Sequence, residues 1–430
     1  MNTDTNAYVD TDTGAATGAR PGRRQHVVVL GAGYAGLTAA LRVSRSHRVT
    51  LVDPKDAFTE RIRLHESAAG RTAAPVPLRE LVAGRDVTPV RARATAIDPG
   101  ARTVRLDDGT TLGYDRLVYA LGSTTDTTRV PGAAEHAYPL ERAGELAARL
   151  SAGPGTVTVV GGGTTGIELA AELAESATGW QVRLVTSGEP GGGLSARGRA
   201  YVGAALTRLG VALHPHTRVR AVHGGGLSTD RGELACDVVV WAASFAVPAL
   251  AAEAGLRVDE RGRALVDGGL RSLSHPDVFV VGDAARVTVP GAGELRMACA
   301  TAMPTGAHAA DAIDALARGR APRPFGFRFV AQCISLGRHD GLVQQLRADD
   351  SPRGLVLTGR PAARVKEWIN RYTLASLRKE GRRPGSYFWV KPLRAAAQDP
   401  AGPPAQAAWS ETSVDLISAT TVVPAARPRA

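Results

Sequence analysis

The stretch that decides the fold is His26–Gly36, HVVVLGAGYAG. Its apolar run predicts a strand buried on both faces, and the residues that follow it predict a helix. Between them, Gly31, Gly33 and Gly36 match the spacing G-x-G-x-x-G. The first glycine allows a tight turn, the second lets a pyrophosphate approach the backbone, and the third lets helix and strand pack closely. The stretch therefore predicts a unit that holds a phosphate group at the positive end of a helix.

A second predicted strand, VTLVDP at Val49–Pro54, carries an acid near its end. This acid, Asp53, lies 22 residues after Gly31. A carboxylate at that distance can accept hydrogen bonds from the hydroxyls of an adenosine ribose. Strand, glycine loop, helix and acid together favour a dinucleotide site over a glycine-rich turn of another kind of α/β protein.

The same pattern occurs a second time in the chain. HVVVLGAGYAGLTAALRV aligns with TVTVVGGGTTGIELAAEL, which contains Gly161, Gly163 and Gly166. A further repeat pairs YDRLVYALGS with CDVVVWAASF, so that Cys236 takes the position of Tyr114 and is expected to serve packing. Internal duplication indicates two related domains, each with its own dinucleotide.

A third motif, VFVVGDAARV, covers Val278–Val287. An apolar strand leads into Gly282 and Asp283, and small residues follow. We expect Asp283 to meet the hydroxyls of a ribityl chain, with a helix N-cap as the alternative.

Composition limits the class of protein. The chain has 430 residues, of which 44% are hydrophobic, and only three cysteines. These numbers allow two or three domains, argue against a disulfide scaffold and favour a reducing cytoplasm. No apolar run reaches the roughly 18–20 residues that a spanning helix needs. Residues 1–24 lack the apolar core of a secretory signal, and we expect them and residues 395–430 to be disordered tails.

The quoted motifs, together with DVFVVGDAA, resemble the flavoprotein superfamily of two-dinucleotide oxidoreductases, and most of all the type II NADH dehydrogenases. The resemblance implies an α/β fold with two Rossmann-like three-layer domains. An FAD domain at residues 25–130 and 265–322 would be split by an NAD(P) domain at 131–264. A C-terminal interface segment would cover residues 323–394.

The resemblance also implies FAD on the first half and NAD(P)H on the second. Glu168 would lie near the flavin and the nicotinamide, and it is the predicted catalytic residue. His65 is the weaker catalytic candidate, as a proton donor to the acceptor, with a structural histidine as the alternative. A helix starting within Ala300–Gly306 would face the flavin with its N-terminus. The predicted cofactor contacts are Gly31, Gly33, Tyr34, Ala35, Gly36, Asp53, Lys55, Arg63, Ala120, Gly122, Gly282, Asp283, Ala302 and Met303, and in the second half Gly161, Gly163, Thr164, Thr165, Gly166, Glu168 and Thr186.

Three departures from the family pattern bear on the substrates. Thr186 stands where many relatives have an acid that would repel a 2′-phosphate, which favours NADPH over NADH. The dehydrogenases have glutamines next to the quinone in the helix after the flavin aspartate. Here that region reads MPTGAH, from Met303 to His308, and lacks them, which argues against a quinone acceptor. The CxxxxC pair of disulfide reductases is absent, and Cys299 with Cys333 is a candidate sulfide-oxidising pair by composition alone.

The C-terminal segment concentrates positive charge. Positions 360–394 contain ten basic residues and only two glutamates, in a chain whose net charge is +11. A helix is predicted at Arg364–Leu377, followed by the aromatic cluster YFWV. Basic residues with aromatics suggest an anchor on an anionic membrane surface, and a helix packed on its own core is the rival. No nucleic-acid fold accompanies the charge.

The leading prediction is an FAD-dependent NAD(P)H oxidoreductase with a quinone or quinone-like acceptor. Two alternatives stay open: a reductase of a small electron carrier such as a ferredoxin, and a flavin-binding protein with little turnover. We expect a cytoplasmic protein, either free or peripheral on the inner face of the cell membrane. A homodimer is left open, and neither nucleic acid nor metal is expected.

Overall fold

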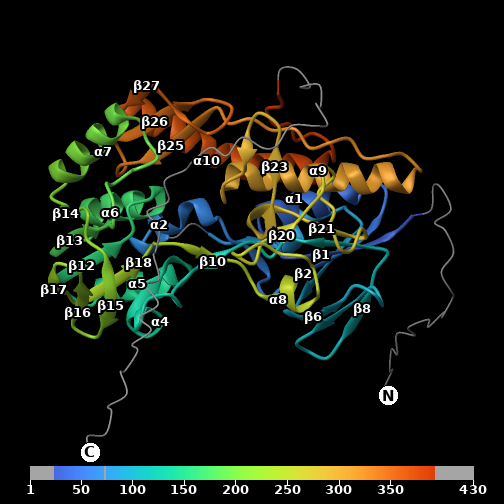
Figure 1. Cartoon of the computed structure of the whole chain (residues 1–430), viewed down its shortest axis with the longest axis horizontal. Helices are drawn as coiled ribbons and strands as arrows, with labels where there is room; N and C mark the ends of the chain where they lie inside the picture. The colour runs from blue at the N-terminus through green and yellow to red at the C-terminus, as the bar shows by residue number, and fades with distance from the viewer. Residues whose placement is uncertain (1–23, 72–73, 393–430) are drawn as a thin grey trace, which may run out of the picture.

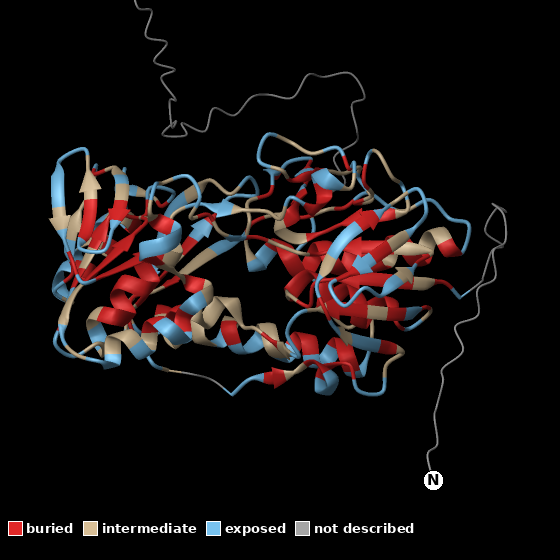
Figure 2. Cartoon of the chain, turned by 90° about the horizontal axis from the view of Figure 1, so that it is seen from below, coloured by how far each residue is buried: buried red, intermediate tan, exposed pale blue. Residues whose placement is uncertain are grey.

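The computed structural model describes residues 24–71 and 74–392, so that apart from Arg24 the two predicted tails lie outside the described residues. Two five-stranded parallel sheets organise the chain (Figure 1). Buried residues gather in two regions, one around each sheet (Figure 2). The predicted α/β class with two Rossmann-like domains is confirmed.

The first sheet has the order β21-β9-β1-β2-β5, and all neighbouring strands are parallel. Helices α1 and α9 pack against each other on one side of it, while the three-stranded sheet β6-β7-β8 and α8 lie on the other (Figure 1). Its elements are β1 (His26–Leu30), α1 (Tyr34–Val43), β2 (Arg48–Asp53), β5 (Val87–Arg91), β6 (Ala94–Asp98), β7 (Thr103–Leu106), β8 (Thr111–Gly113), β9 (Arg116–Tyr119), α8 (Leu250–Glu253), β21 (Val278–Val280) and α9 (Cys299–Ala317).

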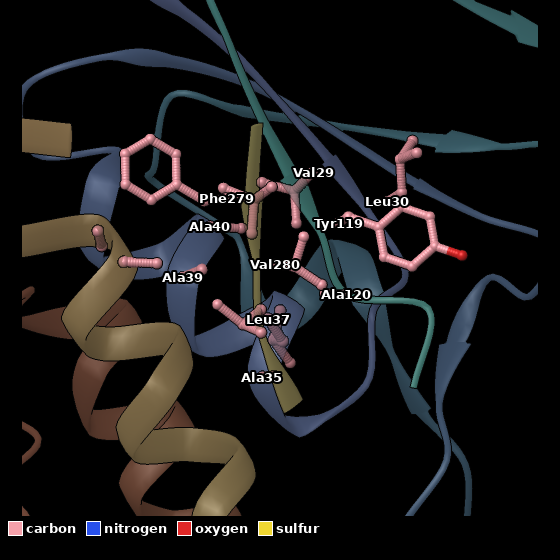
Figure 3. Close-up of a cluster of buried hydrophobic side chains, with 14 of the residues drawn as sticks. Val29, Leu30, Ala35, Leu37, Ala39, Ala40, Tyr119, Ala120, Phe279 and Val280 are labelled. Carbon is pink, nitrogen blue, oxygen red and sulfur yellow. The ribbon is translucent and has the colours of Figure 1, made fainter. Parts of the chain in front are cut away.

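The core of this domain joins elements far apart in the sequence. Figure 3 shows Val29 of β1, Leu37 of α1, Tyr119 of β9 and Phe279 of β21 in one cluster, and all four are fully buried. Close packing of α9 on α1 requires Gly306, because a Cβ there would lie 2.1 Å from the carbonyl oxygen of Ala35.

The second sheet repeats the arrangement with the order β11-β18-β12-β13-β14. Its elements are β11 (Ala137–Pro139), α5 (Ala143–Ser151), β12 (Gly155–Val160), α6 (Thr164–Ser176), β13 (Trp180–Val185), α7 (Ala196–Arg208), β14 (Ala212–His214) and β18 (Val238–Trp241), with a meander of β15 (Val219–His223), β16 (Gly226–Thr229) and β17 (Gly232–Ala235). Cys236 is buried in the core of this domain, as its alignment with Tyr114 predicts.

The chain crosses between the domains twice, and the two crossings pair with each other. Strand β10 (Thr124–Thr125) leads into the second domain and is antiparallel to β19 (Phe245–Ala246), which leads back. The predicted return at position 264 is too late. Leu250 and Leu256 already belong to the core of the first domain, because α8 packs under its β6.

The C-terminal segment bridges both domains. It contains β25 (Ala331–Ser335), β26 (Gly341–Leu346), β27 (Pro352–Thr358) and α10 (Gly359–Arg382). Ile334 and Leu342 join the core of the second domain, whereas Phe327 and Leu377 join that of the first. Helix α10 is longer than predicted. No helix in the described residues has both the length and the apolar content needed to cross a bilayer.

Candidate functional site

The first glycine loop leaves one position open. Gly31 has φ +94°, and a Cβ there would lie 2.5 Å from the carbonyl oxygen of Ala120. A Cβ on Gly36 would lie 1.9 Å from the Gly31 oxygen, whereas one on Gly33 meets nothing within 4 Å. Gly33 is also the N-cap of α1, and no side chain caps that helix. Close packing therefore explains why Gly31 and Gly36 are glycines. Gly33 has open space beside it at an uncapped helix end, which fits an approaching phosphate.

Asp53 lies at the end of β2 and orders this loop. Its Oδ2 accepts a hydrogen bond from Ala32 N at 2.7 Å, and its Oδ1 accepts one from Lys55 N at 2.9 Å. Since a carboxylate has about four acceptor sites, capacity remains for ribose hydroxyls. The Lys55 side chain is exposed, and its Nζ lies 3.3 Å from Thr59 Oγ1.

The ends of two neighbouring strands, β9 and β21, complete this cradle. Gly122 follows β9 with φ +66° and open space at its Cβ position. Asp283 follows β21, and its Oδ2 accepts a hydrogen bond from Ser123 Oγ at 2.7 Å. Asp283 is the middle residue of a short 3-10 turn, Gly282–Ala284, whose N-cap is Val281, so the N-cap alternative is wrong.

Helix α9 begins one residue earlier than predicted, at Cys299. Ala302 and Met303 are buried in the hydrophobic core, and Ala302 N donates within the helix to Ala298 O at 3.1 Å. Their side chains face the core, so any contact of these two residues with the flavin would have to come from the backbone. The helix end that faces outward belongs to Cys299 and Ala300, both exposed.

The second glycine loop reproduces the first. Gly161 has φ +131°, and its Cβ would lie 2.6 Å from the oxygen of Ala242. A Cβ on Gly166 would lie 1.9 Å from the Gly161 oxygen, and one on Gly163 meets nothing within 4 Å. Gly163 is the N-cap of α6, again with no side-chain cap, and Thr164 and Thr165 open the helix. The duplication seen in the sequence thus extends to the backbone contacts of each glycine.

Thr186 occupies the place of Asp53 in the second domain. It is 8% exposed, and a Cβ on Gly162 would lie 2.4 Å from its Oγ1. Its hydroxyl therefore lies against the glycine loop, and no negative charge stands at this position.

Glu168 is the centre of a buried polar cluster between the domains. Its Oε1 lies 2.8 Å from Lys366 Nζ of α10 and accepts a hydrogen bond from Ser335 N of β25 at 2.9 Å. His65 belongs to α2 (Leu64–Ala68), which packs on α6, and is 3% exposed. Elements from all three parts of the chain thus converge on this carboxylate.

The charges in the cluster follow from burial and pairing. Burial alone would raise the pKa of Glu168, but Lys366, His65 and the Ser335 N–H outweigh it, and the pKa is lowered. Burial works to lower the pKa of Lys366, yet Glu168 raises it above the usual value. Burial lowers the pKa of His65, with Glu168 acting against it. At neutral pH the cluster therefore holds a carboxylate, an ammonium and a neutral imidazole.

Sequence reasoning missed Lys366 and Ser335, and it gave no indication of the ion pairs that Arg63 forms. Lys366 counts among the ten basic residues of the C-terminal segment, but its side chain is only 14% exposed. No signal in the sequence sets it apart from the other nine. Arg63, predicted to contact the cofactor, pairs with Glu60, Glu66 and Glu367. Its contact with a cofactor stays a prediction.

Two cysteines flank this cluster. Cys299 is exposed at the start of α9, and Cys333 of β25 is half-buried; both are free thiols. Burial raises the pKa of Cys333 to about 11. Since the thiolate is the nucleophile, Cys333 is not activated at neutral pH.

One turn beyond Glu168, Glu172 provides a stability prediction. Its carboxylate lies 2.8 Å from Arg71, its side chain is 1% exposed, and burial raises its pKa to about 7. The folded state then binds more protons than the unfolded one between about pH 4.5 and 7, so stability falls as pH rises through this window. At about 1.4 kcal/mol per pKa unit, the fall is on the order of 3 kcal/mol. Glu172→Gln should flatten the dependence of Tm on pH in that window.

The matched control is Glu253→Gln, which alters an exposed glutamate of α8. An unchanged pH dependence in Glu172→Gln would contradict the assignment of the raised pKa to Glu172.

The sequence profile described as pyridine nucleotide-disulphide oxidoreductase matches residues 25–310. An NADH dehydrogenase-like protein of Mycobacterium tuberculosis is 32% identical over 66% of this chain and 78% of its own length. A type II NADH:quinone oxidoreductase of Staphylococcus haemolyticus is 28% identical over 81% of this chain and 94% of its own.

Among solved structures, the sulfide:quinone oxidoreductase of Aquifex aeolicus superposes with a TM-score of 0.72 at 20% identity. The superposition covers 84% of this chain and 93% of the other. At this identity the likeness establishes the fold alone.

Proposed function

Because the chain belongs to the pyridine nucleotide-disulphide oxidoreductase family, we propose that it is an FAD-dependent enzyme that oxidises NAD(P)H and reduces a quinone. The observation that carries the proposal is the buried Glu168–Lys366 pair, located where both nucleotide domains and the C-terminal segment meet. Relatives named type II NADH:quinone oxidoreductases support the choice of substrates.

The residues present fit the two nucleotides. The loop at Gly33, with Asp53 and Asp283, would hold FAD, and the loop at Gly163 would hold NAD(P)H. The flavin, when bound, supplies hydride acceptance and onward electron transfer. The chain would contribute positioning. Holding the nicotinamide against the flavin would make hydride transfer effectively unimolecular, which lowers the barrier by several kcal/mol.

Glu168 and Lys366 would supply charge and protons at this junction. A buried carboxylate fixed by an ammonium gives a defined electrostatic field near the reacting rings. Neutral His65 beside them can relay a proton to the acceptor, because it can take up one proton on one ring nitrogen and release another from the other ring nitrogen. The raised pKa of Cys333 argues against a sulfide-oxidising pair of Cys299 and Cys333, which needs a thiolate.

The nicotinamide preference gives a direct test. With Thr186 in place of an acid, nothing there repels a 2′-phosphate, and exposed Arg197 of α7 can meet it. We expect NADPH to bleach the flavin at least as fast as NADH in anaerobic mixing, with a quinone restoring the colour. Arg197→Ala should lower kcat/KM for NADPH about tenfold and leave NADH unchanged, because one charged contact is worth roughly 1.5 kcal/mol.

A higher kcat/KM for NADH than for NADPH would contradict this preference without affecting the flavin chemistry. Failure of both nicotinamides to bleach the flavin would contradict the enzyme itself and favour a binding protein.

The outer face of α10 supports a membrane surface as the working site. Two aromatic side chains of α10 face outward: Trp368 is 63% and Tyr372 is 48% exposed, and their rings stack at 5.3 Å. Leu377 of the same helix is fully buried. The same helix carries exposed basic residues, namely Arg360, Arg364, Arg371, Arg378, Lys379 and Arg382. We place the protein on an anionic bilayer through this face.

Flotation with anionic vesicles tests this placement. Arg364→Gln/Lys379→Gln should weaken binding up to about 30-fold, since each basic residue near the surface contributes about 1 kcal/mol. Arg220→Gln/Arg231→Gln, which removes two exposed charges from the second domain, should have little effect. No flotation at low salt would contradict the membrane site. Salt-sensitive reduction of a ferredoxin would then favour the carrier-protein alternative.

A further inference from the structure

A cavity of about 230 Å³ lies between α10 and α3 (Leu78–Leu81), apart from the glycine loops and the Glu168 cluster. It is lined by Val76, Glu80, Leu81, Ala83, Arg378, Gly381 and Arg382. Its volume corresponds to several water molecules at about 30 Å³ each, which is enough for a small polar headgroup.

The walls of this cavity are held rigidly. A Cβ on Gly381 would lie 2.7 Å from the carbonyl oxygen of Leu81, so α10 can cross α3 this closely only at a glycine. The end of α10 is fixed by Glu380, which is fully buried and accepts hydrogen bonds from Gly385 N at 2.6 Å and Tyr387 N at 2.7 Å. The cavity is therefore preformed.

The lining has two kinds of charge and an apolar floor. Arg378 and Arg382 are one turn apart on α10, a spacing that puts their Cβ atoms about 5–6 Å apart. Among the described residues, neither guanidinium forms an ion pair. The charge of Arg378 acts to lower the pKa of the half-buried Glu60. Glu80 is exposed on the opposite wall, while Val76 and Leu81 are buried.

We propose that this cavity binds the headgroup of an aminophospholipid, with its phosphate between Arg378 and Arg382 and its ammonium on Glu80. Two guanidiniums match the oxygens of a phosphodiester, the carboxylate matches the ammonium, and Val76 and Leu81 receive the glycerol end. The site extends the basic outer face of α10, so a lipid from a bilayer bound there can reach it. The inference rests on the membrane placement proposed above and makes it specific to one lipid class.

Calorimetry on the flavin-loaded full chain tests the proposal with soluble probes. Dihexanoyl phosphatidylethanolamine, below its micelle concentration, should bind at least about tenfold more tightly than inorganic phosphate, phosphoethanolamine or dihexanoyl phosphatidylglycerol. Arg378→Gln/Arg382→Gln should abolish binding, and Glu80→Gln should remove the preference for the amine. The matched control Arg364→Gln/Lys379→Gln should keep both, since its residues lie outside the lining.

Equal binding of inorganic phosphate would overturn the lipid assignment in favour of a free-phosphate site. An equal loss of probe binding in Arg364→Gln/Lys379→Gln would show that binding depends only on the overall positive charge of α10. That result would also overturn the proposal. Vesicle flotation separates this from the membrane placement: flotation without probe binding rejects the cavity alone, and probe binding without flotation rejects the placement alone. Quinone reduction by NAD(P)H, measured in parallel, tests the proposed enzyme independently.

Discussion

Gly33→Val is expected to give a folded protein that purifies without flavin. No atom lies within 4 Å of the position that a Cβ would take at Gly33. The polypeptide alone therefore tolerates the larger side chain, which would instead fill the space where a pyrophosphate meets the uncapped end of α1. Flavin absorbance per protein should fall at least about tenfold, since excluding the phosphate removes more than about 1.4 kcal/mol of binding.

Two companion variants sharpen this result. Gly163→Val changes the equivalent glycine of the second loop and should keep the flavin while raising KM for the nicotinamide. Gly36→Ala should destabilise the protein itself, because its Cβ would lie 1.9 Å from the Gly31 oxygen. Retention of flavin by Gly33→Val, or its loss in Gly163→Val, would contradict the assignment of the two loops.

Lys366→Met is expected to have the largest effect of any single substitution in the polar cluster. It leaves Glu168 buried without its ammonium, and breaking a buried pair costs about 3–5 kcal/mol. The Glu168 pKa should rise, so that the carboxylate takes up a proton at neutral pH and the pH profile of turnover moves upward. Thermal unfolding and the pH dependence of kcat measure the two consequences separately.

Glu168→Gln should retain flavin, because its backbone lies away from the first glycine loop, and should slow turnover. The double variant Glu168→Gln/Lys366→Met should recover stability relative to Lys366→Met, because neither charge is then left unpaired. A double variant no more stable than Lys366→Met would show that the two groups are not coupled. Unchanged turnover in Glu168→Gln would remove its catalytic role.

The duplicated βα units could be predicted from sequence because their constraints are local. Gly31 and Gly36 are dictated by contacts within one loop and with the neighbouring strand. A run such as Val27–Leu30 can hardly be anything but a strand buried on both faces. The same locality allowed Cys236 to be assigned to packing by its alignment with Tyr114.

The polar cluster could not be predicted, because its members come from α2, α6, β25 and α10. Nothing within the sequence around Lys366 distinguishes it from its surface neighbours. Only the packing of α10 against β26, allowed by Gly341, turns this side chain inward. The outward position of Trp368 and Tyr372 could not be predicted for the same reason: amphipathic spacing does not say which face of a helix packs against protein.

The pairing of β10 with β19 has a consequence for how the chain folds. Thr124 lies opposite Ala246, so the inserted domain enters and leaves the first domain at one point. Once the insert has folded, its two ends are already together, and β21 can join β9 across residues 120–123 and 247–277 without spanning the insert as well. The entropy of closing so long a loop is thus lost when the inserted domain folds, and not when the first domain assembles its sheet. A single proteolytic cut at either connection would accordingly leave the two domains associated.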